Sequence, residues 1–173
     1  MGLFGRLFSK KSNEEIHAQH FIINAFEYIK ANKNNLPDKP ALKRATSTNE
    51  FDYWAALVAL RAADTGAIIK YGIDNPLTRK LLQTMISEFQ DINTHVSKNL
   101  QYNQAFIQSL NKHGRLGDEI KNIQEANGFW LLYSLKMETL DYAEPENKEA
   151  ARIIGNWLFD KYTKYWDDIP LYK

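Results

Sequence analysis

The chain contains no cysteine over its 173 residues. Disulfide bridges, zinc sites built from thiolates and cysteine nucleophiles are therefore excluded. A protein without disulfides suits a reducing compartment, and we expect a cytoplasmic location. A chain of this length is typical of one domain.

Long hydrophobic runs are also missing. The most hydrophobic stretch, residues 51–71, includes Asp52, Arg61, Asp64 and Lys70. A charged residue near the centre of a bilayer costs about 2.5–3.5 kcal/mol. This stretch is therefore not a transmembrane helix.

No charge of one sign dominates, and the formal net charge is +1. Residues 1–116 are net basic and residues 117–173 are net acidic. A nucleic-acid-binding protein would have a basic stripe and a much higher pI, so we expect no nucleic-acid partner. The acidic C-terminal third instead favours a basic protein partner.

Strand signals are scarce, because short β-branched runs separated by hairpin turns do not recur. Apolar residues instead recur at three- and four-residue spacing, and the hydrophobic content of 44% is sufficient for a core. The sequence therefore predicts an all-α, single-domain bundle of five to six helices over residues 12–173, preceded by a short amphipathic segment over residues 1–11. The helices are expected at residues 12–32, 50–71, 76–113, 120–140 and 145–169, the third being one bent helix or two.

Local signals place the ends of these helices. Ser12–Glu15 and Ser47–Glu50 each have the pattern of a capping box, and Gly72 is a helix stop. Residues 33–47 are expected to form a polar, proline-containing loop. The helix at 50–71 is rich in alanine, which allows close approach of neighbouring backbones, so we expect it at the centre.

The first helix has an apolar face that we expect to contact the core. Ile16, Ile23, Phe26 and Ile29 lie near that face, which Phe21 and Ile22 widen.

Four large apolar residues share one side of a short N-terminal amphipathic helix: Leu3, Phe4, Leu7 and Phe8. The myristoylation pattern requires Ser or Thr at position 6, where this chain has Arg6, so lipidation is excluded. Arg6 instead lies where it would meet anionic headgroups if the partner is a membrane. In pattern alone, the segment resembles the short C-terminal amphipathic feet of some bacterial division-site ATPases. The alternatives are that it packs against the bundle or frays.

The C-terminal stretch is rich in aromatic and acidic residues: Tyr162, Tyr165, Trp166, Asp167 and Asp168. Tyrosine and tryptophan are enriched in protein interfaces, and acidic neighbours steer a basic partner. We therefore assign these five residues to a partner-binding surface. A cap over the end of the bundle explains them equally well.

Candidate metal ligands are few. Glu14 and His17 form one Glu-x-x-His pair, and Glu88, Asp91 and His95 follow much later in the chain. A di-iron bundle needs two such pairs and two further carboxylates. A solvated helix start explains Glu14 better, so we assign neither a metal ligand nor a cofactor.

Arg61 and Asp64 lie three residues apart on the alanine-rich helix. They form either a local pair at the edge of the bundle, which we favour, or the lining of a pocket. No catalytic motif is present, and no catalytic residue is assigned.

These observations favour a non-enzymatic helical protein that binds another protein, as an inhibitor, immunity or adaptor protein. The excess of Lys and Asn over Arg suits a bacterial source with an AT-rich genome. The alternatives are a peripheral protein at the inner face of the membrane, which uses the N-terminal segment, and a helical metal-dependent enzyme.

The membrane alternative makes a direct prediction. Deleting residues 2–11 removes the amphipathic side and should release the protein from anionic liposomes in a sedimentation assay. If the intact protein does not sediment with the liposomes either, the membrane alternative is wrong.

Overall fold

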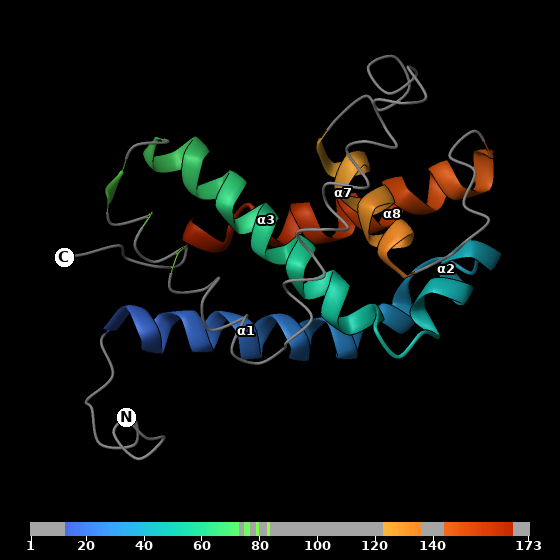
Figure 1. The fold of residues 1–173 in the computed structure, drawn as a ribbon, viewed down its shortest axis with the longest axis horizontal. Helices are drawn as coiled ribbons and strands as arrows, with labels where there is room; N and C mark the ends of the chain where they lie inside the picture. Colours follow the sequence, from blue (N-terminus) through green and yellow to red (C-terminus); the bar gives the residue numbers. More distant parts are fainter. Residues whose placement is uncertain are drawn as a thin grey trace, which may run out of the picture.

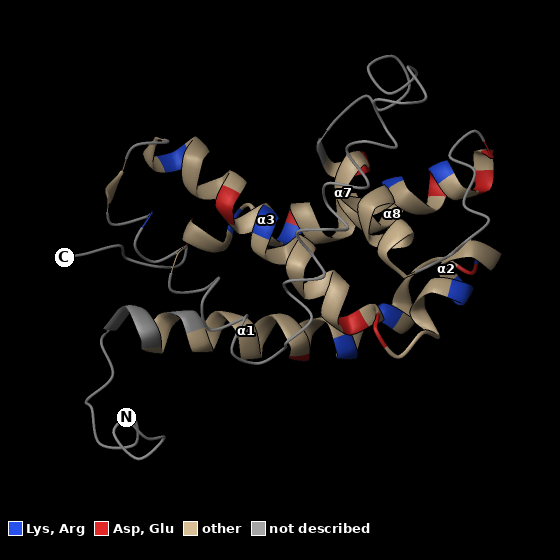
Figure 2. Cartoon of the chain, in the orientation of Figure 1, with Lys and Arg blue, Asp and Glu red and all other residues tan. Residues whose placement is uncertain are grey.

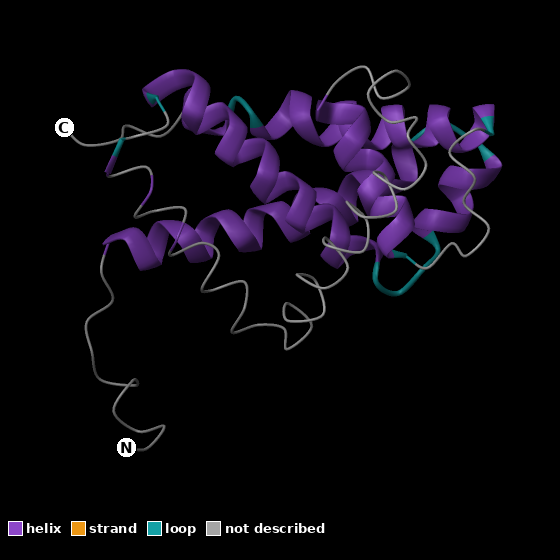
Figure 3. Ribbon diagram, turned by 45° about the horizontal axis from the view of Figure 1, so that its top comes forward, coloured by secondary structure: helices purple, strands orange, loops and turns teal. Residues whose placement is uncertain are grey.

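The structure is a computed structural model that describes residues 13–72, 75, 76, 79, 83, 123–135 and 144–167 (Figure 1). The described residues form five α-helices and no strand (Figure 3). The helices are α1 (Asn13–Asn32), α2 (Pro40–Thr46), α3 (Phe51–Tyr71), α7 (Ile123–Ser134) and α8 (Pro145–Tyr162). Two short 3-10 helices, η2 (Lys33–Asn35) and η3 (Tyr165–Asp167), follow α1 and α8. The predicted all-α, single-domain bundle is confirmed, and the helix predicted at 76–113 lies outside the continuously described ranges.

Helix α3 lies at the centre of the bundle, as its alanine content predicts. Helices α1, α7 and α8 all contact it, and Figure 1 shows it crossing between α1 and the α7–α8 pair. All six of its alanines are buried: Ala55, Ala56, Ala59, Ala62, Ala63 and Ala67. The helix ends where predicted, because Gly72 adopts a φ of 84°, which favours glycine.

The backbones of α7 and α8 touch at two glycines. A Cβ atom at Gly128 would overlap the carbonyl oxygen of Ala151, and a Cβ atom at Gly155 would overlap that of Gln124. These pairings run in opposite directions along the two helices, so α7 and α8 are antiparallel. Any side chain at either glycine would push the helices apart.

A third glycine joins the end of α8 to the central helix. A Cβ atom at Gly66 would overlap the carbonyl oxygen of Thr163, directly after α8. Beyond this contact the side chain of Trp166 enters the core, and its Nε1–H donates to the carbonyl oxygen of Ala63 at 2.6 Å. The prediction that the last helix continues to Pro170 is therefore wrong, because α8 ends at Tyr162.

The segment predicted as a polar loop contains the helix α2. Pro40 occupies its first turn, where the missing N–H costs nothing. Ala41, Leu42 and Ala45 are buried and hold one side of α2 against the bundle. Three apolar residues over two helical turns form a pattern that is too short for periodicity to distinguish a helix from a loop.

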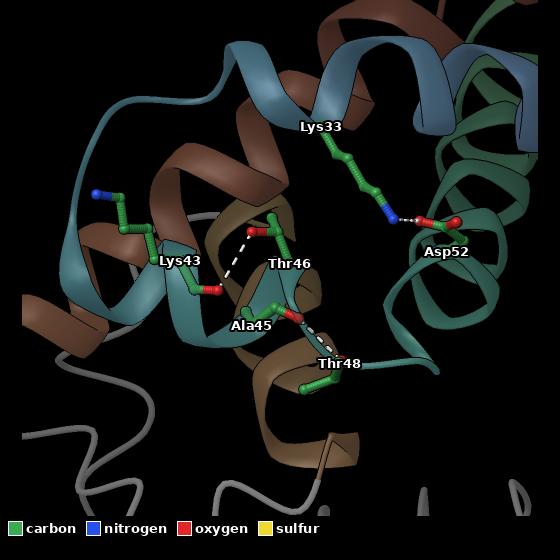
Figure 4. Close-up of polar contacts among 6 residues, drawn as sticks. All are labelled: Lys33, Lys43, Ala45, Thr46, Thr48 and Asp52. Atoms are coloured by element: carbon green, nitrogen blue, oxygen red, sulfur yellow. Dashed lines mark hydrogen bonds and ion pairs between the residues drawn. The ribbon is translucent and has the colours of Figure 1, made fainter.

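The predicted capping box at Ser47–Glu50 is wrong. Helix α3 has Glu50 at its N-cap, without a hydrogen bond from its side chain to the helix backbone. The Ser47 and Thr48 hydroxyls instead donate to the carbonyl oxygens of Arg44 and Ala45, at 2.9 and 2.8 Å. They therefore close the end of α2, as Figure 4 shows for Thr48.

An ion pair ties the end of α1 to the start of α3. Lys33 Nζ lies 2.8 Å from Asp52 Oδ1, and both side chains are about four-fifths buried. Figure 4 shows the Lys33 side chain extending from the segment after α1 directly to Asp52 on α3. Asp52 also lies in the first turn of α3, where a negative charge is favoured by the helix dipole.

Exposed ion pairs join α2 to the beginning of α8. Lys39 lies 3.4 Å from Glu149, and Arg44 lies 3.5 Å from Glu146. Figure 2 shows basic positions on α2 close to acidic positions on α8. Exposed pairs contribute about 0–1 kcal/mol each. Burial of Leu42 therefore fixes α2 more than its charges do.

The glycine contacts predict the effect of added methyl groups. Gly128→Ala or Gly155→Ala should lower the free energy of unfolding by about 3 kcal/mol, because a backbone carbonyl occupies the space that the new Cβ needs. Urea unfolding followed by circular dichroism measures the change. The control is Asn156→Ala, an exposed position on α8. It should change the free energy by less than about 1 kcal/mol, in the stabilising direction. Equal effects at positions 155 and 156 would contradict the contact.

Candidate functional site

The structure places two of the predicted partner-binding residues in the core. Tyr162 is 3% exposed and Trp166 is 0% exposed. Tyr165 is half-buried and Asp167 is exposed, whereas Asp168 lies outside the described residues. The burial of Tyr162 and Trp166 therefore fits the alternative explanation, in which the C-terminal aromatic residues cap the end of the bundle.

Aromatic contacts show what this cap does. The ring of Phe21 on α1 lies edge-on to those of Tyr162 and Tyr165, with centroids 5.7 and 4.8 Å away. Tyr28, two turns further along α1, contacts Tyr162 at 5.8 Å and stacks on Trp157 at 5.9 Å. The tyrosines thus join α1 to α8 and η3, which is a structural role.

Burial changes the acidity of the two tyrosines. It raises the pKa of Tyr165 to about 12. It also raises the pKa of Tyr162, and the neighbouring Tyr28 and Tyr165 add to that effect. Both phenols therefore stay protonated in the fold well above pH 10, the pKa of a free tyrosine.

Next to this cap, the end of α3 exposes two adjacent isoleucines. Ile68 is 39% exposed and Ile69 is 77% exposed. The following residue, Lys70, donates from Nζ to the carbonyl oxygen of Trp166 at 2.7 Å and to Asp167 Oδ1 at 3.1 Å. We call Ile68, Ile69, Lys70 and Asp167 the α3–η3 surface. Sequence reasoning found Asp167 and missed the isoleucines.

Lys70 fixes the geometry of the α3–η3 surface. Its hydrogen bond to Asp167 raises the pKa of Lys70 above the ordinary value of a lysine. The charges of Lys70 and Asp167 neutralise each other. The exposed apolar side chains of Ile68 and Ile69 are therefore the main feature of this surface. No local signal in the sequence marks these isoleucines as exposed, because a similar adjacent apolar pair, Phe21 and Ile22, is buried.

Helix α1 also exposes apolar side chains. Ile16 is 39% exposed and Ile23 is 53% exposed, and their spacing of seven residues places them on one face of the helix. The prediction that these two face the core is wrong. Of the other residues predicted on or beside this face, Phe21, Ile22 and Ile29 are buried, together with Ala25.

Arg61 interacts electrostatically with Asp64 on α3, and its side chain contacts α7. The guanidinium of Arg61 is 4.9 Å from the ring centroid of Trp130 and within 3.5 Å of Asn127 Oδ1. Although the residue as a whole is exposed, burial lowers the pKa of Arg61, and Asp64 partly offsets this. Burial raises the pKa of Asp64, and Arg61 partly offsets that.

The same interface contains two buried donors. Within the described part of the chain, Trp130 Nε1 and Ser134 Oγ have no hydrogen-bond partner. They lie one turn apart on α7, and the Trp130 ring packs edge-on against Trp54 at 5.4 Å. This packing explains the burial of the indole, because the edge of one ring meets the face of the other.

The remaining predicted site residues are the candidate metal ligands and the N-terminal apolar and basic residues. His17 is exposed, and the described residues hold no group of three or more potential metal ligands. Neither the side chain of Glu14 nor the later candidates Glu88, Asp91 and His95 belong to the described part. The N-terminal residues lie outside it too: Leu3, Phe4, Arg6, Leu7 and Phe8. Among the described helices, none is both long and apolar enough to cross a bilayer.

No protein-family model, curated protein or solved structure matches this chain. The side chains that the described helices expose are therefore the main indication of function. Of these, the α3–η3 surface has the most exposed large apolar residue.

The raised tyrosine pKa predicts a loss of stability at alkaline pH. The unfolded chain releases the Tyr165 proton near pH 10, whereas the fold retains it up to about pH 12. Because the unfolded state then binds fewer protons, the free energy of unfolding should fall as the pH rises between these values. Tyr165→Phe should make this fall shallower, as measured by urea unfolding over that range, and leave the pH dependence below pH 10 unchanged. Identical slopes for the two proteins would show that Tyr165 ionises normally in the fold.

Proposed function

We propose that this protein acts without catalysis, by binding another protein through the α3–η3 surface, as an inhibitor, immunity or adaptor protein. The observation that carries the proposal is the exposure of Ile69, at 77%, beside the partly exposed Ile68. The preceding turn of α3 is anchored by three buried small residues, Ala63, Gly66 and Ala67. The exposed isoleucines thus lie at the end of a helix that is otherwise anchored in the core.

The energetics of burial support a contact at this position. Covering a fully exposed isoleucine contributes about 1.5–3 kcal/mol. Lys70 joins the end of α3 to η3, and Trp166 anchors η3 beneath it through its hydrogen bond to Ala63. A partner would therefore meet a surface that is already ordered, which lowers the entropic cost of binding.

Charge supports the proposal less than apolar contact does. Glu146 and Glu149 are paired with basic residues of α2, and Asp167 is paired with Lys70. The acidic residues expected to attract a basic partner are thus largely compensated in the described part of the chain. We propose that apolar contact with Ile68 and Ile69 provides the affinity, and that charge contributes to orientation.

The cellular setting is part of the proposal. The absence of cysteine supports a cytoplasmic protein, and the high content of Lys and Asn supports a bacterial source.

The test is capture of a partner by the immobilised full-length chain from an extract of the source organism. Ile69→Asp adds a charge at an exposed position and should reduce recovery of a stoichiometric partner by at least about tenfold. Ile23→Asp makes the same change at an exposed position on α1 and should retain the partner. Circular dichroism and thermal unfolding of both variants establish that each is folded.

Two outcomes would contradict the proposal. Recovery of no stoichiometric protein by the wild-type chain would argue against protein binding as the function. Equal recovery by wild type and Ile69→Asp would leave protein binding in place and show that the α3–η3 surface does not carry it.

A further inference from the structure

We draw no further inference here: the strongest candidate, the exposed apolar end of α3 at Ile68 and Ile69, belongs to the site already described, and nothing in the described part of the chain shows which partner chemistry covers it.

Discussion

The contact between the backbones of α7 and α8 at Gly128 and Gly155 is the constraint on which the described fold depends. Two helices that approach this closely leave no space for a side chain between them. The C-terminal end of α8 then packs against α3, where the carbonyl oxygen of Thr163 lies against Gly66. Small residues therefore set the helix spacing, and large aromatic residues such as Trp166, Phe21 and Phe51 fill the core between the helices.

This arrangement determines which side chains are left for function. The turn after α8 directs Trp166 into the core, and Tyr162 is buried against α1. The aromatic residues near the C-terminus are thus largely used to hold the fold together. The adjacent end of α3 is held in place by Lys70 and exposes Ile68 and Ile69. The packing of η3 against the end of α3 therefore determines the proposed binding surface.

The sequence predicted the features that local physics determines. The helical class, the central helix and the start of α8 at Pro145 follow from spacing and from proline chemistry. The sequence predicted only in part which apolar residues are buried, because burial also depends on neighbours distant in the chain. Burial of Trp166 depends on Ala63, whose carbonyl oxygen accepts from the indole N–H, and Ile23 is exposed because α1 contacts the core through another face. A glycine such as Gly128 reduces helix propensity locally, and its packing role appears only once α8 is in place.

Native-state hydrogen exchange tests the central claim most directly. If the α7–α8 contact holds the bundle together, the slowest amides of both helices exchange only through global unfolding, with an opening free energy equal to that measured in urea. Exchange of α7 and α8 through a partial opening, while α1 and α3 remain protected, would contradict the account.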